Sequence, residues 1–122
     1  MTILRDGRTD PFFDGARRDV LMIRRCAECR HWHAPDATVC AECGGEDLDW
    51  AEAEGRALLV SWSKVHRRDG GEPAHIALVE LAEGPWLHAA LDQVDRPREN
   101  LPLRAGFVHA EAGEPHLVFR PL

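Results

Sequence analysis

The sequence predicts a mainly β protein in which a short N-terminal helix precedes two folded parts. Three observations lead to this class. The 122-residue chain has four cysteines, and these form two Cys-x-x-Cys pairs in its first half. Beyond residue 56, short apolar runs alternate with turn signals, as is typical of small all-β domains. No segment carries the periodic apolar pattern of a long helix.

The first element is expected to be a short helix near the N-terminus. Asp10 can cap it, and Pro11 suits the first helical position, where the missing N–H costs nothing. Gly15 keeps the helix short. Phe12 and Phe13 would lie on its apolar side, where they either close the protein's own core or form part of a subunit interface.

The cysteines give the strongest signal in the chain. A Cys-x-x-Cys turn places two sulfurs on one side of a tight knuckle, and two knuckles can surround one ion in the tetrahedral arrangement that zinc takes. Four thiolates leave no position for an activated water, so such a zinc would be structural and would fold a segment poor in aliphatic residues. The expected ligands are Cys26, Cys29, Cys40 and Cys43.

Other states of these cysteines were weighed against zinc. Two disulfides are possible in principle, but a polar, charged stretch follows Met1, so we expect a cytoplasmic protein with reduced thiols. Rubredoxin-type iron uses the same paired knuckles. His31 and His33 lie between the pairs, but four sulfurs suffice as ligands, so both histidines are expected on the surface.

The rest of the chain predicts five strands separated by turns rich in glycine, proline and charge. Five strands in about 65 residues match the size of an OB-fold, although an SH3-like barrel has similar dimensions and periodicity does not separate the two. The strands are expected at residues 57–65, 76–81, 86–91, 103–110 and 116–119.

Charge and composition exclude some function classes. The net charge of −6 argues against nucleic acid as the main partner, because neutralising phosphates needs an excess of basic side chains. No run of about 18 apolar residues predicts a membrane-spanning helix. Lys64 is the only lysine, and arginine supplies the other positive charges, which suits contacts with phosphate or carboxylate.

Several motifs follow one another in a recognisable order. They are Pro11-Phe12-Phe13-Asp14-Gly15, the two cysteine pairs with Pro35 between them and Gly44 after them, Trp50, Gly55-x-x-x-x-Val60-Ser61-Trp62, Ala77-Leu78-Val79-Glu80-Leu81-x-Glu83-Gly84-Pro85 and Phe119-Arg120-Pro121. This order resembles the acyl-CoA-associated OB-fold family with an N-terminal rubredoxin-like zinc ribbon, long catalogued as a domain of unknown function. The resemblance covers roughly residues 10–121. It departs from the family at Arg30, where a glycine is common.

The resemblance implies a fold and a role. The fold would consist of a helical arm at 1–19, a zinc ribbon at 20–50 and an OB-fold domain at 51–122. Members of the family are small, usually non-catalytic partners of thiolase-like enzymes, including lipid-transfer-type thiolases and aldolases, or of acyl-CoA hydratases. They stabilise the partner or help to hold acyl-CoA. The chain is therefore expected to be a non-enzymatic subunit of a hetero-oligomer without membrane contact.

The residues agree with a non-catalytic role. No cysteine is left over as a nucleophile, and nothing marks Ser61, Ser63 and His66 as a triad. If the chain contacts CoA, the phosphates of CoA could meet two arginine pairs, Arg24, Arg25, Arg67 and Arg68. The partner surface is expected to include three exposed aromatic residues, Phe12, Phe13 and Trp50.

Two other functions remain open from the residues. A nucleic-acid-binding module could stack bases on Trp62 and Trp86, but the chain has no tyrosine and its net charge has the wrong sign. An electron carrier with iron at the four cysteines is the third hypothesis.

Overall fold

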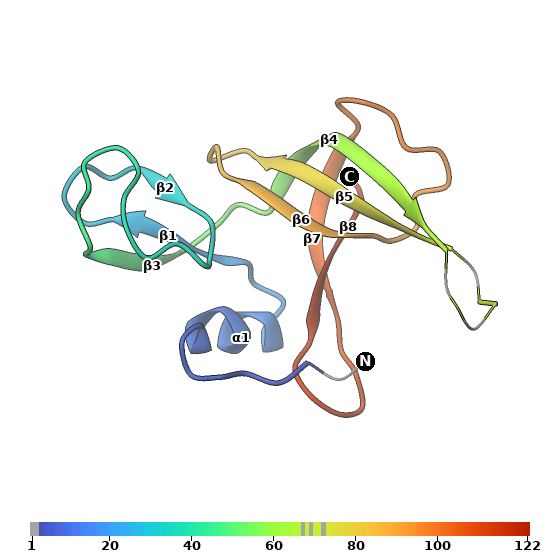
Figure 1. Ribbon diagram of the computed structural model, residues 1–122, viewed down its shortest axis with the longest axis horizontal. Helices are drawn as coiled ribbons and strands as arrows, with labels where there is room; N and C mark the ends of the chain where they lie inside the picture. Colours follow the sequence, from blue (N-terminus) through green and yellow to red (C-terminus); the bar gives the residue numbers. More distant parts are fainter. Residues whose placement is uncertain (1–2, 67, 69, 72) are drawn as a thin grey trace.

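The computed structural model describes residues 3–66, 68, 70–71 and 73–122. In these residues one helix precedes a run of strands, which confirms the predicted mainly β class (Figure 1). The same residues contain no helix with the length and apolar character needed to cross a membrane. The elements are α1 (Asp10–Arg17), β1 (Met22–Cys26), β2 (Trp32–His33), β3 (Leu48–Glu52), β4 (Arg56–Val65), β5 (Ala74–Leu81), β6 (Trp86–Leu91), β7 (Pro102–Val108) and β8 (His116–Pro121).

Strands β1, β2 and β3 form a small antiparallel sheet with β1 in the middle, here called the ribbon. The register places Arg24 opposite His33 and Cys26 opposite Leu48. The buried apolar cluster between its loops consists only of Cys26, Cys40 and Leu48. The ribbon thus lacks an aliphatic core of its own, which is the situation in which a bound metal supplies folding energy.

Strands β4 to β8 close into a barrel in the order β4-β5-β6-β8-β7, and β7 pairs back with β4. The pair formed by β6 and β8 is parallel, with Ala90 opposite Val118, while the other pairs are antiparallel. This order, with a parallel pair between the third and fifth barrel strands, is the OB-fold arrangement. The topology therefore confirms the OB-fold and decides against an SH3-like barrel.

One hydrophobic core joins the barrel to the N-terminal elements. Leu59, Val79 and Phe119 of the barrel are fully buried in it, and so are Ala16 of α1 and Ile23 of β1. Figure 1 shows the ribbon and the barrel next to each other, with α1 below their junction. The ribbon is therefore attached to the barrel by shared packing as well as by the connecting chain.

The start of α1 differs from the prediction by one residue. Thr9 is the N-cap and Asp10 is the first helical residue, so Pro11 occupies the second helical position. The N–H groups of the first turn have no intrahelical acceptor, so the proline still costs no hydrogen bond. Asp10 does not cap the helix, and its carboxylate instead lies 3.7 Å from Nη1 of Arg5.

Glu114 fastens the N-terminal arm to the loop between β7 and β8. Its buried carboxylate accepts hydrogen bonds from Arg5 and Arg17, each with a shortest distance of 2.7 Å. Its backbone N–H donates to the carbonyl of Ile3 at 2.7 Å. The hydrogen bonds from Arg17, and then those from Arg5, lower the pKa of Glu114 to about 2. Both partners are needed, because a buried carboxylate without them is strongly destabilising.

We expect Glu114→Gln to lower the midpoint of thermal unfolding at pH 7, because an amide cannot balance two guanidinium groups. A carboxyl with a depressed pKa stabilises the fold above its unfolded pKa of 4.5 and loses this contribution as the pH falls towards about 2. The difference between wild type and variant should therefore shrink over this pH range. The measurement is circular dichroism at stepped pH. Glu111→Gln, exposed on the same loop, is the control, and an equal loss in both variants would contradict the interpretation.

Candidate metal centre

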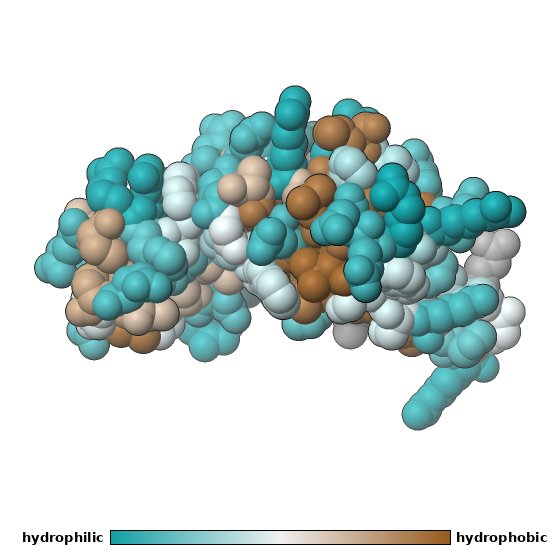
Figure 2. All heavy atoms as spheres, turned by 90° about the horizontal axis from the view of Figure 1, so that it is seen from above, coloured by the Kyte–Doolittle hydropathy of each residue, from teal (hydrophilic) through white to brown (hydrophobic). Residues whose placement is uncertain are grey.

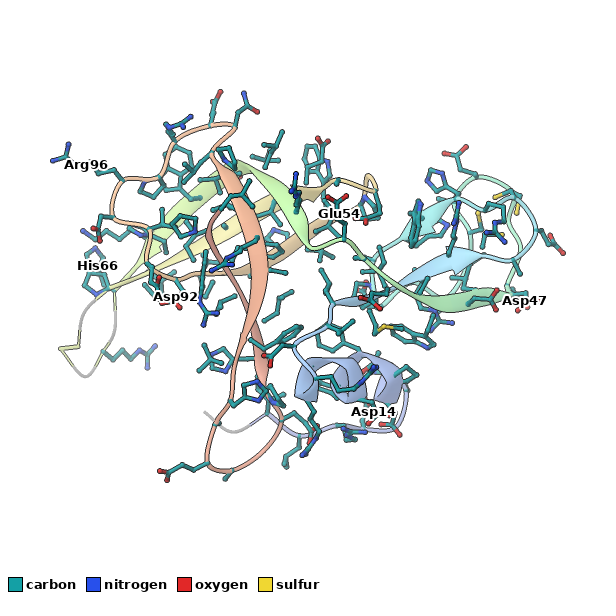
Figure 3. All side chains as sticks on the ribbon, turned by 180° about the vertical axis from the view of Figure 1, so that it is seen from behind. Asp14, Asp47, Glu54, His66, Asp92 and Arg96 are labelled. Atoms are coloured by element: carbon teal, nitrogen blue, oxygen red, sulfur yellow. The ribbon has the colours of Figure 1, made fainter. Side chains whose placement is uncertain are left out.

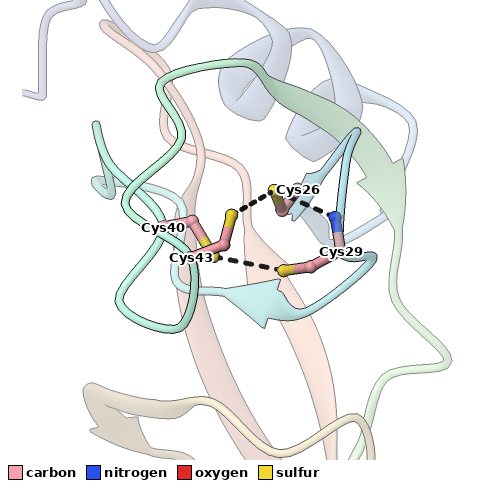
Figure 4. Close-up of side chains that lie close together, drawn as sticks. All are labelled: Cys26, Cys29, Cys40 and Cys43. Atoms are coloured by element: carbon pink, nitrogen blue, oxygen red, sulfur yellow. Dashed lines mark hydrogen bonds between the residues drawn. The ribbon is translucent and has the colours of Figure 1, made fainter.

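The four cysteine sulfurs meet at one point between the two knuckles (Figure 4). All four Sγ atoms lie within 4.8 Å of one another. The Sγ atoms of Cys26 and Cys43 are 3.6 Å apart, and those of Cys29 and Cys40 are 3.4 Å apart, so each close pair joins opposite knuckles. Cys26 and Cys40 are buried, whereas Cys29 and Cys43 are exposed. The centre therefore lies at the surface of the ribbon.

This spacing fits a single zinc ion. With Zn–S bonds of about 2.3 Å, sulfurs at the corners of a regular tetrahedron lie about 3.8 Å apart. The two cross-knuckle distances, 3.4 and 3.6 Å, are slightly shorter than that edge, so small side-chain adjustments complete the tetrahedron. Four sulfur ligands leave no open position for water or substrate, so the ion would be structural.

The electrostatics of the sulfurs also favour a bound cation. The backbone N–H of Cys29 donates to the sulfur of Cys26 at 3.5 Å and lowers the pKa of Cys26 to about 7. At Cys43, the N–H of Gly45 favours the thiolate, but hydrogen bonds with the three other sulfurs, together with burial, outweigh it and raise the pKa to about 12. Four crowded thiolates repel one another, so their full deprotonation requires a cation between them.

The two knuckles have matching backbones. The carbonyl of Cys26 accepts the N–H of Arg30 at 3.0 Å, and the carbonyl of Cys40 accepts the N–H of Gly44 at 2.9 Å. Arg30 has φ 70° and Gly44 has φ 75°, both in the left-handed region. Glycine adopts this conformation freely, whereas a side chain there costs roughly 1–2 kcal/mol. Arg30 therefore forms the same turn as Gly44, but under strain.

The two histidines near the centre differ in their burial. His31 is exposed, with Nε2 3.9 Å from the carboxylate of Glu42. His33 is buried, so the prediction that it lies on the surface is wrong. It is the buried residue of β2, beside the half-buried Trp32. Its ring meets that of His31 edge-on, with centroids 4.9 Å apart. Burial lowers the pKa of His33.

Arg24 and Arg25, two of the arginines suggested as CoA contacts, hold the ribbon together. The guanidinium of Arg24 lies over the ring of Trp50 at 4.4 Å, and that of Arg25 lies over the ring of Trp32 at 4.5 Å. Each guanidinium also donates a hydrogen bond of 2.8 Å to a backbone carbonyl. These are cation–π contacts between neighbouring strands, one on each side of β1.

The other suggested pair belongs to the loop after β4. Arg68 is exposed there, and Arg67 lies outside the described residues. Figure 3 shows His66, which precedes this loop, at the end of the barrel remote from the ribbon. The structure therefore does not bring Arg68 together with the two arginines of the ribbon.

Phe12, Phe13 and Trp50 are half-buried, so the prediction that they are exposed is wrong. Phe12 stands edge-on to Phe107 of the barrel, with centroids 6.1 Å apart, and to Phe13 at 5.2 Å. Trp50 is covered by the guanidinium of Arg24. Phe12 thus helps to close the protein's own core, and the role of the three aromatics in partner binding stays a prediction.

A groove of about 380 Å³ opens where α1, the ribbon and the barrel meet. Its apolar walls include Phe12, Pro35, Leu87 and Leu117. A smaller cavity of about 120 Å³ shares Pro35 and Asp36 with the groove and is also lined by Arg8 and Arg24. A groove with apolar walls and a cavity with two arginines and one aspartate therefore lie side by side. Sequence reasoning missed this arrangement, because its residues come from separate segments that no motif connects.

The serines and tryptophans of the barrel that the sequence singled out form neither an activated nucleophile nor a shared surface for stacking bases. Ser61 and Ser63 lie on β4, and within the described residues neither hydroxyl hydrogen-bonds a histidine. Trp62 lies on the inward side of the sheet, opposite a buried alanine. Trp86 lies on the outward side, opposite Glu80, whose carboxylate accepts the indole N–H at 2.9 Å. The two tryptophans therefore do not form one platform for bases.

Metal removal should unfold the ribbon before the barrel, because the ribbon's own apolar cluster is so small. We expect one zinc per chain by elemental analysis, and loss of amide protection in β1 to β3 when a chelator is added. Cys29→Ser should weaken zinc binding by more than about tenfold, the loss that even an outer-shell change produces. Thr38→Ser, in the loop before the second knuckle, is the control and should keep the zinc.

Arg30→Gly should stabilise the protein by up to about 1 kcal/mol, because it relieves the left-handed strain. The gain should appear in thermal unfolding of the zinc-loaded protein. Gly44→Arg makes the reciprocal change in the other knuckle, where nothing within 4 Å would obstruct a Cβ, and should destabilise by a similar amount. If Arg30→Gly destabilised the protein, the strain argument would fail.

Two family models match the chain. The model described as the rubredoxin-like zinc ribbon domain of ChsH2 matches residues 13–49, and the one described as the C-terminal OB-fold domain of ChsH2 matches residues 50–108. The match to a zinc ribbon and the geometry of the four sulfurs agree, so the cysteines form a zinc site, as the sequence predicted.

Two solved structures are similar to the chain. A chain of the structure described as "Ltp2-ChsH2(DUF35) aldolase" superposes with a TM-score of 0.82 at 30% identity and covers 96% of both chains. A DUF35-family protein of unknown function from Sulfolobus solfataricus superposes with a TM-score of 0.68 at 15% identity, over 95% of this chain and 86% of the other. At that identity the second structure supports the fold alone.

Two curated relatives also match. A "Probable enoyl-CoA hydratase alpha subunit" of Thermomonospora curvata is 31% identical over 115 residues, which are 90% of this chain and 36% of the relative. A "DUF35 domain-containing scaffold protein" of Pyrococcus furiosus is 28% identical over 74 residues, which are 56% of this chain and 54% of the relative. The chain thus spans only about a third to a half of these relatives. With its ribbon, its barrel and these matches, the chain belongs to the ChsH2 (DUF35) family.

Proposed function

We propose that the chain is a non-catalytic subunit of a thiolase- or aldolase-type enzyme complex that acts on acyl-CoA thioesters. The observation that carries this proposal is its similarity, over 96% of both chains, to a chain of the structure described as an Ltp2-ChsH2(DUF35) aldolase. The relative described as a probable enoyl-CoA hydratase alpha subunit supports the link to acyl-CoA. The relative described as a scaffold protein supports an assembling role.

The chemistry of the chain supports a subunit that stabilises its partner. All four cysteines point to the metal centre, and a zinc with four sulfur ligands offers no site for catalysis. The serines of β4 lack a hydrogen-bonded histidine among the described residues. The reacting groups would therefore come from a thiolase-like subunit, with which this chain would form a hetero-oligomer in the cytoplasm.

The chain would also help to bind CoA through the groove and the arginine-lined cavity beside it. The apolar walls of the groove suit the uncharged arm of an acyl-CoA. Arg8 and Arg24 line the cavity, and Nε of Arg24 is buried without a hydrogen-bond partner among the described residues. A phosphate oxygen there would satisfy that donor through a charge-assisted hydrogen bond.

Co-expression with a thiolase-like protein from the same source tests the assembly. We expect the two chains to co-elute in size exclusion, with one zinc per copy of this chain and with acyl-CoA cleavage that requires the thiolase-like chain. If this protein remained a zinc-loaded monomer in the presence of its candidate partners, the proposal would fail.

The CoA contact has its own test in the assembled complex. Arg24→Gln should weaken CoA binding by about tenfold or more, the loss expected for one charge-assisted hydrogen bond. Arg25→Gln is a matched control, because Arg25 stacks on Trp32 as Arg24 stacks on Trp50 but lines neither the groove nor the cavity. Equal affinities in the two variants would place CoA elsewhere.

A further inference from the structure

The outer face of the barrel carries three arginines in a row across β4, β7 and β8. The register places Arg56 opposite Arg104, and Arg104 opposite Arg120. Directly opposite residues of antiparallel strands have Cβ atoms about 4.5–5.5 Å apart, and like charges in such pairs destabilise a sheet. This arginine row (Arg56, Arg104 and Arg120) is thus unfavourable for the isolated barrel.

Only the two ends of the arginine row are neutralised among the described residues. Nε of Arg56 lies 3.2 Å from the carboxylate of Glu54, and Nε of Arg120 donates to Asp92 at 2.8 Å. Figure 3 shows Glu54 in the linker before β4 and Asp92 at the end of β6. Arg104 is exposed and forms no ion pair or hydrogen bond with any described residue. An uncompensated arginine thus lies between two others in a chain of net charge −6.

A glycine on β7, Gly106, leaves room for the side chain of Arg120. A Cβ on Gly106 would lie 2.5 Å from Nη1 of Arg120, so the glycine lets the guanidinium lie across β7. Glycine weakens a strand interior, and it commonly marks a place where another group approaches the backbone closely. The Arg120 guanidinium therefore lies over Gly106, which leaves room for it, and its hydrogen bond to Asp92 fixes its position.

An apolar row runs beside the arginine row on the same face. Leu58 lies opposite Pro102, and the N–H of Leu122 donates to the carbonyl of Pro102 at 3.2 Å. Leu58 and Leu122 are 40% and 64% exposed. These three residues line a groove of about 420 Å³ together with Arg56 and with Glu80, which lies opposite Leu58. The carboxylate of Glu80 accepts the indole N–H of Trp86 at 2.9 Å. Figure 2, viewed from above, shows apolar side chains gathered on the barrel with hydrophilic residues around them.

We propose that this face binds an acidic amphipathic helix of the partner subunit, with carboxylates on the arginine row and apolar side chains in the groove. The inference rests on the proposed function, since it supposes a partner enzyme. Strand addition is excluded here, because β7 is paired on both sides and offers no free edge. The two rows are about 7 Å apart along the strands, so a helix about 10 Å wide can contact both.

The charge pattern favours a protein carboxylate as the bound group. Arginine binds carboxylates through two parallel hydrogen bonds, and the adjacent apolar row supplies the desolvated centre that a protein interface needs. A free phosphate would use the arginine row alone and leave Leu58 and Leu122 without a role. The two kinds of ligand therefore predict different effects of changing the apolar row.

The test measures the affinity of this chain for its thiolase-like partner by calorimetry. Arg104→Glu and Leu58→Ser should each weaken binding by about tenfold or more. Arg68→Glu is the matched control, because Arg68 is also exposed and lies in the loop after β4. Arg104→Glu should also raise the midpoint of thermal unfolding, since it replaces repulsion along the arginine row with attraction. A variant that is more stable but binds less well cannot be explained by misfolding.

The outcomes separate this inference from the proposed function. If wild type binds its partner and both variants bind equally well, the inference is overturned while the proposed function stands. If wild type forms no complex, the proposed function fails and the inference with it. A third outcome would also overturn the inference: inorganic pyrophosphate binds wild type but not Arg104→Glu, and Leu58→Ser leaves the complex unaffected. The arginine row would then be a site for a small anion.

Discussion

The convergence of four sulfur atoms on one point is the constraint on which the N-terminal half of the structure depends. Between residues 22 and 52 the apolar cluster around the knuckles is too small to hold two loops in place, and a cation between the four sulfurs would offset the repulsion between their thiolates. Once the loops are fixed, β1 has a fixed direction. Its other end then places Ile23 in the barrel core, beside Ala16 of α1.

Through its zinc, the ribbon would shape the groove beside α1 without taking part in catalysis. The groove beside α1 has one wall from the ribbon and two from other elements, so its shape follows from how the ribbon is held. The arginine row belongs to β4, β7 and β8, and the groove beside it shares no lining residue with the groove beside α1. Under the two proposals, the chain would contact a ligand at the groove and a partner protein at the arginine row.

Local features were predictable from the sequence, and features that depend on register were not. The spacing of the four cysteines and the positions of the barrel strands are set by neighbouring residues. The OB-fold itself depends on the parallel pairing of β6 with β8, which no local pattern reports. The arginine row depends on the register of three strands, and a slip of one residue would turn Arg104 inward. His33 was mispredicted because a two-residue strand carries no period from which to read its face. Arg24 and Arg25 were suggested as CoA contacts, and their stacking on Trp50 and Trp32 was not foreseen, because these partners lie on neighbouring strands.

The strands β3 and β8 show that the limits of the matched regions are not the limits of the folded parts. The two matched regions meet between residues 49 and 50, but β3 runs from Leu48 to Glu52 across that point. The matched barrel region ends at residue 108, whereas β8, which pairs with both β6 and β7, begins at His116. An excised fragment with those limits would be an open sheet with two unpaired edges, the kind of surface that drives aggregation. The segment that folds as a unit is therefore longer at both ends than the matched barrel region. A fragment or fusion should include all of β3 and β8.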